Sequence, residues 1–340
     1  MVRSGVVAFL IRLNAVLEKI MPLLTPSAIV IGVLLSTRVS SYEYLVPWIF
    51  AGMTFIGSLK SSFGDIGREL YRPWKLLTIL LILHVVMPCA GWLSGKLFFP
   101  DDPLTAMGCL LLFVLPTGVV SVVWVSIYRG NLALTLSLIL IDTLLSPLVV
   151  PASLYVLMGQ TVEIQVWEMM QGLLWMIVLP SLAGMLVNQW TKGKVNAAWG
   201  PSLAPFVKIG MFVVVVINGS VIAPYFRRFD NHLAVVVAVT LGTAVVGYLI
   251  GWGVSSLLRW NREDSVAMQF NAGMRNISAG AVIAVQYFPA AVSLPVISGM
   301  LFQQLLAALF GYRLARKDAR LNKLQSGSLP GAGAAVSDRA

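Results

Sequence analysis

The chain has 340 residues, of which 58% are hydrophobic and only 11% are charged, and its mean hydropathy is +0.85. Soluble domains carry about 25% charged residues, so this composition excludes a soluble globular protein. A formal net charge of +10 would suit a nucleic-acid binder if the protein were soluble, but here the basic residues follow the topology of a membrane protein.

The N-terminal segment 1–20 has a basic start and an apolar stretch, as a secretory signal peptide has. No small-residue cleavage site follows, and Arg12, Glu18 and Lys19 interrupt the apolar run. We therefore expect an interfacial helix that leads into the first membrane span.

Apolar segments long enough to cross about 30 Å of hydrocarbon recur along the whole chain. They predict ten membrane-spanning helices, at residues 14–36, 43–60, 74–97, 104–128, 130–157, 167–191, 205–226, 232–257, 263–286 and 290–312. We expect one all-α integral membrane domain over residues 1–320. Residues 321–340 end in small and polar residues and are predicted to form a disordered cytoplasmic tail.

The positions of the basic residues predict the orientation of these spans. With both termini in the cytoplasm, 18 of the 24 Lys and Arg residues fall on the inner side, and only Arg38, Lys96, Arg227 and Arg228 fall on the outer side. This asymmetry is what the positive-inside rule describes. It predicts a multi-pass protein of the cell (plasma or inner) membrane with cytoplasmic termini, which contacts the lipid bilayer and no nucleic acid.

Spans 104–128 and 263–286 both contain residues that interrupt a helix. Pro116 lacks a backbone N–H and Gly118 weakens the same turn, while Gly273 lies in the other span. A broken span leaves N–H groups at the start of its second half, where the positive end of the helix dipole favours anions.

These two broken spans are the fourth and the ninth. Ten spans divide into two sets of five, at about 14–157 and 167–312, and an odd number of spans makes the second set enter the membrane from the opposite side. The sequence therefore predicts two inverted five-helix repeats, an architecture in which discontinuous helices build a transport site near the midplane.

The residues around the breaks resemble a known family. Leu115–Pro151 is similar, without gaps, to the bile acid:sodium symporter family, in which a Pro-Gly-Gly-x-x-Ser-Asn break precedes a basic-Gly-polar turn and a Ser/Thr-rich span. Phe270–Asn276 is similar to the family's Glu-x-Gly-x-Gln-Asn break, and Gly57–Pro88 to its second and third spans. The resemblance implies a panel domain beside a core domain in which broken helices 4 and 9 cross.

The resemblance also implies two sodium ions held by side-chain oxygens, the ligands that hard cations prefer. The residues that differ from the family at those positions are Asn271, Arg275, Val122, Ile139 and Leu83, whereas Ser121, Thr135 and Asn276 are retained. Hydrocarbon side chains cannot ligate sodium and Arg275 would repel it. We therefore expect neither the family's two-sodium coupling nor a metal or other cofactor.

We expect a secondary active transporter of a small or medium organic anion that works by alternating access. The predicted substrate-binding residues lie in the two breaks and are Val119, Ser121, Asn271, Arg275 and Asn276. The guanidinium and the N–H groups of both second half-helices would neutralise a carboxylate.

A charge in the middle of a span needs a partner, and Asp142 is the candidate partner for Arg275. We hypothesise that Arg275 and Asp142 pair at the crossover and that Arg275 stands in for a bound cation. A purely structural ion pair is the alternative. If protons drive transport, Asp142 and His84 are the candidate coupling groups, and uncoupled exchange is also open.

Other functions have less support in the sequence. A non-transporting sensor or scaffold with the same fold would also explain the lost sodium ligands. Oxyanion efflux carriers related to the family use a cysteine in the broken fourth span, but Cys109 lies about two turns before Pro116. An enzyme that uses His84 and Asp142 as acid and base would lack a nucleophile motif, so we expect a protein that is not an enzyme. The residues do not specify the anion, the direction of transport or the oligomeric state.

Overall fold

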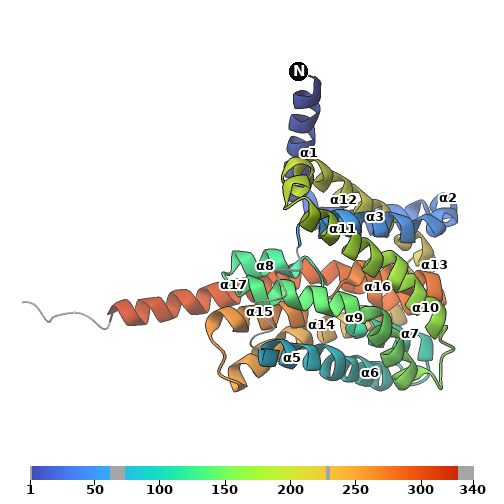
Figure 1. Ribbon diagram of the computed structural model, residues 1–340. Helices are drawn as coiled ribbons and strands as arrows, with labels where there is room; N and C mark the ends of the chain where they lie inside the picture. The colour runs from blue at the N-terminus through green and yellow to red at the C-terminus, as the bar shows by residue number, and fades with distance from the viewer. Residues whose placement is uncertain (1, 62–72, 227–229, 328–340) are drawn as a thin grey trace, which may run out of the picture.

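The computed structural model describes residues 2–61, 73–226 and 230–327, and every element within these ranges is a helix (Figure 1). The first half of the chain comprises α1 (Val2–Leu34), α2 (Ser36–Val39), η1 (Ser40–Leu45), α3 (Val46–Ser58), α5 (Pro73–Leu81), η2 (Ile82–Val86), α6 (Met87–Phe98), α7 (Pro103–Val114), α8 (Ser121–Ile127) and α9 (Leu132–Met158). The second half comprises α10 (Val166–Leu173), η3 (Leu174–Val178), α11 (Leu179–Trp190), α12 (Lys194–Val221), α13 (Ala223–Phe226), α14 (Asn231–Leu257), α15 (Arg262–Gly273), α16 (Ile277–Tyr287) and α17 (Ala290–Gly327).

Six helical stretches are long and apolar enough to cross a membrane by themselves: Pro73–Phe98, Leu132–Met158, Val166–Trp190, Lys194–Val221, Asn231–Leu257 and Ala290–Arg316. A seventh span is possible if Leu23–Leu34 and Ser36–Ser58, which meet at an angle of 85°, count as one bent pair. The protein is therefore an all-helical multi-pass membrane protein, as its composition predicts.

The remaining predicted spans differ from single long helices. The predicted spans 14–36 and 43–60 correspond to the bent pair. The predicted spans 104–128 and 263–286 are each divided into two short helices, α7 with α8 and α15 with α16, so none of these four helices has the length of a full span. The interruption has a local cause, because Pro116 and Gly273 lie where the helices stop.

Figure 1 shows two layers of helices. In one layer, α1 and α3 pack against α12, and α3 also packs against α11. The other layer contains α5 to α9 and α14 to α17, with α7, α14 and α16 packed on α17. The span that begins with α10 starts against α9 and ends with α11 against α3, so it passes from the second layer to the first.

The last helix continues beyond the boundary predicted for the tail. Helix α17 ends at Gly327, so residues 321–327 are helical, whereas residues 328–340 of the predicted tail lie outside the described residues. In Figure 1 the end of α17 projects from one side of the helical body, and the start of α1 projects from the layer that contains α3.

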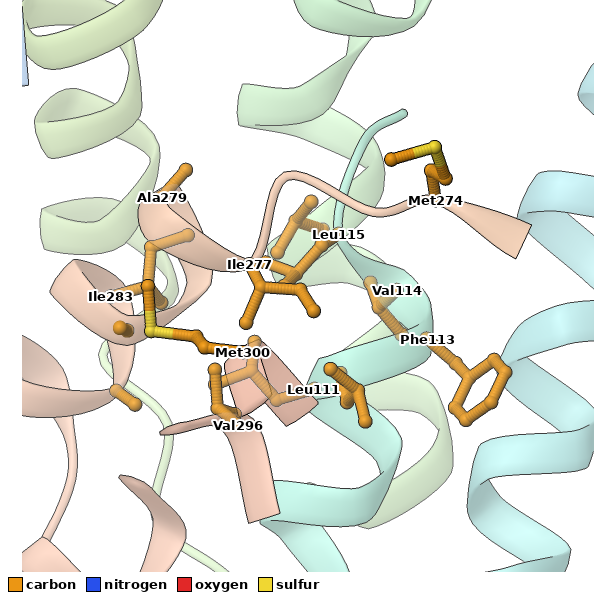
Figure 2. Close-up of a cluster of buried hydrophobic side chains, with 14 of the residues drawn as sticks. Leu111, Phe113, Val114, Leu115, Met274, Ile277, Ala279, Ile283, Val296 and Met300 are labelled. Atoms are coloured by element: carbon orange, nitrogen blue, oxygen red, sulfur yellow. The ribbon is translucent and has the colours of Figure 1, made fainter. Parts of the chain in front are cut away.

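A cluster of buried apolar side chains supports the region where the short helices end (Figure 2). It joins the end of α7, the start of α16 and α17, and the side chains shown from these elements include Leu111, Leu115, Ile277 and Met300. Dense packing of this kind resists small displacements, so it holds the interrupted backbone in one arrangement.

Candidate functional site

The first break begins where α7 ends. Leu115 has an extended backbone, with φ −56° and ψ 146°, and Pro116 follows it without an N–H group to offer to the helix. Helix α8 begins only at Ser121. The intervening backbone is therefore free to make hydrogen bonds with another part of the chain.

The second break separates α15 from α16. Met274 is extended, with φ −114° and ψ 112°, and Asn276 caps α16 by accepting a hydrogen bond from the backbone N–H of Ala279 at 3.2 Å. Arg275 lies between these two residues, at the point where the chain has no helical partner.

The two breaks pair with each other. Thr117 and Arg275 form an isolated antiparallel bridge, in which the N–H of Gly118 donates to the carbonyl of Met274 at 3.0 Å and the N–H of Asn276 donates to the carbonyl of Pro116 at 2.8 Å. In a membrane, irregular backbone must find partners inside the protein, and each break supplies them for the other. The crossing is therefore one structural unit.

The Arg275 side chain is the charged group at this crossing. Arg275 is 4% exposed, and its Nη1 donates to the carbonyl of Leu115 at 3.3 Å. Its Nε and Nη2 have no hydrogen-bond partner among the described residues. A buried guanidinium with free N–H groups is costly unless an anion or a polar molecule binds to it.

A cavity of about 290 Å³ lies beside the crossing, between the two layers. Its lining comes from α1, α3, α11 and α12 on one side and from the first break, α9, the second break and α17 on the other. Of the described residues that line it, Arg275 is the only one with a charged side chain. Hydroxyl and amide groups are contributed by residues that include Thr54, Thr143 and Gln303.

Three of the five predicted substrate-binding residues line this cavity, namely Val119, Arg275 and Asn276. Val119 is 58% exposed, which places the break beside open space. The other two predicted residues, Ser121 and Asn271, are fully buried and do not line the cavity.

Ser121 and Asn271 belong to a buried polar network that does not line the cavity. The hydroxyl of Ser121 donates to Asn271 Oδ1 at 2.9 Å, and Asn271 Nδ2 donates to Thr135 Oγ1 at 3.1 Å and to the carbonyl of Ala267 at 2.8 Å. The Asn271 amide thus uses its oxygen and its nitrogen on protein groups that are themselves buried.

Replacing Asn271 with Ala should lower the free energy of unfolding by about 1 to 2 kcal/mol, because the buried Ser121 hydroxyl loses its acceptor and the Thr135 hydroxyl oxygen loses a donor, while Thr135 keeps its own bond to the Asn131 carbonyl. The change can be measured by SDS-induced unfolding of the purified protein in detergent micelles. Asn231→Ala is the matched control, since Asn231 is exposed at the start of α14. Equal stability of the two variants would contradict a structural role for the network.

The Asp142 side chain lies between the backbone of the first break and the His84 imidazole. Asp142 is fully buried, and its Oδ2 accepts a hydrogen bond from the backbone N–H of Thr117 at 2.6 Å. Its Oδ1 lies 3.1 Å from His84 Nε2, an ion-pair distance that lacks the geometry of a hydrogen bond. His84 lies in η2, a π-helical turn, and such turns are frequent at functional sites.

The predicted direct ion pair between Arg275 and Asp142 is not formed. The two charges interact electrostatically, but no ion-pair contact within 4 Å joins these described residues. The physical reason is competition, because the carboxylate is held by Thr117 N–H and His84, while the guanidinium turns to the Leu115 carbonyl.

Several groups at the site were not predicted from the sequence. The N–H of Thr117 and the carbonyl of Leu115 are backbone groups, which carry no residue-specific signal. Gln303 and Gln304 line the cavity from α17, and their position as two adjacent amides within an apolar helix was a signal that could have been used. Within the described ranges, no group of three His, Cys, Asp or Glu side chains is arranged to hold a metal ion.

An all-helical membrane protein in which two interrupted helices pair beside a cavity has the features of a secondary transporter. Residues 47–229 match the sodium bile acid symporter family. The chain belongs to this family, which confirms the resemblance noted in its sequence and makes it a member of a family of transporters rather than of enzymes.

The chain is similar to curated proteins over most of its length. It is 48% identical over 296 residues to the uncharacterized protein YbaS of Bacillus subtilis, covering 87% of this chain and 97% of that protein. It is 24% identical over 296 residues to the uncharacterized sodium-dependent transporter YocS of the same organism, covering 85% and 89% of the two chains. It is 27% identical over 255 residues to the probable chloroplastic sodium/metabolite cotransporter BASS1 of Arabidopsis thaliana, covering 74% of this chain and 62% of that protein.

Proposed function

We propose that this protein is a secondary active transporter of a small or medium organic anion that binds beside the crossing of the two breaks. The observation that carries the proposal is the buried Arg275 guanidinium, which lines the cavity and whose Nε and Nη2 donors have no partners among the described residues. A carboxylate or sulfonate at this position would accept charge-assisted hydrogen bonds. Asn276, which also lines the cavity, would contribute a further polar contact.

The cavity favours an anion with a single charge and an apolar body. Arg275 provides one positive charge, and most other side chains around the cavity in the described chain are apolar, such as Phe50, Met211 and Met300. Apolar pockets with a few well-placed polar groups are typical of small-molecule sites. Cys109 is buried within α7 and is not among the residues that line the cavity, so the site does not favour the alternative of cysteine-dependent oxyanion efflux.

We further propose that the chain forms ten membrane segments arranged as two inverted five-helix repeats, with both termini in the cytoplasm. The layer with α1, α3, α11 and α12 would be the panel, and the layer with the crossing would be the core. Rocking of one layer against the other would expose the site to each side in turn.

In this orientation the described conformation would face the cytoplasm. The cavity is lined by Ser58 at the end of α3 and by Ser61 just after it, which lie at the predicted inner end of the span 43–60. On the opposite side, Gln286 Nε2 donates to the carbonyl of Glu43 at 3.1 Å and joins the two layers.

The residues present do not fit the sodium ions of the family. Val122, Ile139 and Leu83 offer no oxygen side chains, Arg275 is a permanent cation, and the Asn271 amide oxygen already accepts from Ser121. Although two of the relatives are named as sodium-dependent or sodium/metabolite transporters, we propose that this chain works without the two-sodium coupling of its family.

Thermal unfolding of the purified protein with a panel of carboxylates and sulfonates of increasing size tests the proposed anion site and the proposed absence of sodium coupling. At least one anion is expected to raise the melting temperature, and the increase should be the same in sodium chloride and in choline chloride of equal concentration. An increase in melting temperature that requires sodium would refute the proposal that this chain works without sodium coupling. Failure of every anion to stabilise the protein would refute the anion site.

A further inference from the structure

The His84–Asp142 pair lies outside the cavity but touches the crossing. Neither residue is among those that line the cavity, whereas Asp142 Oδ2 binds the backbone N–H of Thr117, the residue that bridges to Arg275. Oδ1 is the carboxylate oxygen without a hydrogen-bond partner in the described chain, and it lies 3.1 Å from His84 Nε2. Oδ2 is thus hydrogen-bonded to the backbone, whereas Oδ1 is available to bind a proton.

His84 connects this buried carboxylate to the edge of its helix bundle. The Asp142 side chain is 0% exposed, whereas the His84 side chain is 16% exposed. Imidazole is the side chain whose ordinary charge change lies closest to neutral pH, so it is suited to relay a proton to a carboxylate.

Few other titratable groups lie on the helices packed against this pair. Arg275 interacts electrostatically with Asp142 from the second break. On α5 and α15, Lys75 and Asp264 pair with each other, and Asn131 also binds Asp264. The other ionisable side chains on these elements are Cys109 on α7, Tyr155 on α9, Glu168 on α10, Arg262 and Glu263 on α15, and Cys89 and Lys96 on α6.

The charges of Asp142 and Arg275 oppose each other at the crossing. When Asp142 is ionised, its negative charge offsets part of the attraction that the guanidinium exerts on an anion in the cavity. When Asp142 is protonated, the Arg275 charge acts on the anion unopposed. Protonation also weakens the hydrogen bond to the Thr117 N–H, because bonds to an ionised acceptor are stronger than bonds to a neutral one.

We propose that Asp142, with His84 as its relay, binds the proton that is carried together with the anion. The inference rests on the proposed anion transport. Proton binding at Oδ1 raises the affinity for the anion, and a bound anion raises the affinity for the proton by the same factor, because linkage between two sites is reciprocal. The proton comes from the water on one side of the membrane and is released to the other side, so the protein acts as a proton–anion symporter in place of a sodium symporter.

The experiment uses the purified full-length protein in liposomes with radiolabelled benzenesulfonate, an anion that stays ionised so that only the protein titrates. Two processes are measured: exchange of internal for external benzenesulfonate, and its accumulation under an imposed pH gradient. The wild type is expected to show both. Asp142→Asn, which mimics the protonated carboxyl, is expected to continue exchange and to lose accumulation, and His84→Gln to accumulate more slowly.

His232→Gln is the matched control. His232 Nε2 lies at the same distance, 3.1 Å, from Asp102 Oδ2, but both side chains of that pair are exposed. This variant should exchange and accumulate like the wild type. Accumulation by Asp142→Asn at the wild-type rate would overturn the proton site, and exchange without accumulation in the wild type would overturn proton coupling while leaving the carrier intact.

A second measurement decides the proton site even if benzenesulfonate is not exchanged, an outcome that would count against the proposed anion site. Infrared difference spectra of the purified protein are recorded as the pH is lowered, without any anion substrate. Among the carbonyl stretches of the chain's 14 Asp and Glu residues, one band should be present in the wild type, missing from the Asp142→Asn spectrum, and form at a different pH in His84→Gln. Identical spectra for wild type and Asp142→Asn would overturn the inference.

Discussion

Arg275→Gln is expected to weaken binding of a stabilising anion by about 10- to 100-fold, because hydrogen bonds to a charged group contribute about 1.5 to 3 kcal/mol. The guanidinium is the one charged side chain that the described chain presents to the cavity, and its Nε and Nη2 donors are free for a ligand. The effect is measured as the shift in the anion concentration that gives half of the thermal stabilisation. Flux in liposomes should fall in parallel.

Two further variants separate loss of the anion contact from other effects of the change. Arg262→Gln makes the same substitution at an exposed arginine that pairs with Asp318, and it should leave anion binding unchanged. Arg275→Gln combined with Asp142→Asn restores charge balance at the crossing. If the double variant binds anions as the wild type does, the defect came from the uncompensated Asp142 charge, and the assignment of Arg275 as the binding group is wrong.

Gly118→Ala is expected to lower the free energy of unfolding by about 2 to 3 kcal/mol and to abolish anion-induced stabilisation. A Cβ atom at position 118 would lie 2.8 Å from the carbonyl oxygen of Arg275 and 3.1 Å from its carbonyl carbon. Both atoms belong to backbone that is already held by the hydrogen bonds of the crossing, so the two breaks would have to move apart. The same displacement would move the guanidinium relative to the cavity.

Gly52→Ala provides the comparison for this prediction, because a Cβ atom at Gly52 in α3 would meet nothing within 4 Å. Since Ala is a better helix former than Gly, this control should be as stable as the wild type or slightly more so. SDS-induced unfolding in detergent micelles gives both values. A Gly118→Ala protein that unfolds like the control and still responds to anions would show that close contact between the breaks is not required.

The general architecture could be predicted because its causes are local in the sequence. Long apolar segments must lie in the bilayer, and the family could be recognised from short motifs around Pro116 and Gly273. The interruption of two spans likewise follows from backbone chemistry, since proline removes a donor and glycine weakens a helix wherever the chain places them.

The partners of the polar side chains could not be predicted in the same way. The expected Arg275–Asp142 pair was chosen from spacing along one helix, whereas the actual partner of Asp142 is a backbone N–H in a segment that is not helical. His84 was recognised as titratable, but its approach to Asp142 takes place from a π-helical turn, in which the usual spacing of an α-helix does not apply.

An all-helical membrane protein of a transporter family with two weakened spans follows from the residues alone, because hydropathy, proline and glycine act on the chain locally. That Val119, Arg275 and Asn276 line one cavity, while Ser121 and Asn271 are buried away from it and bonded to each other, follows from how distant helices pack. Which way a polar side chain turns at a break depends on the backbone path and on the competing donors and acceptors from distant helices, and these are brought together only when the helices pack.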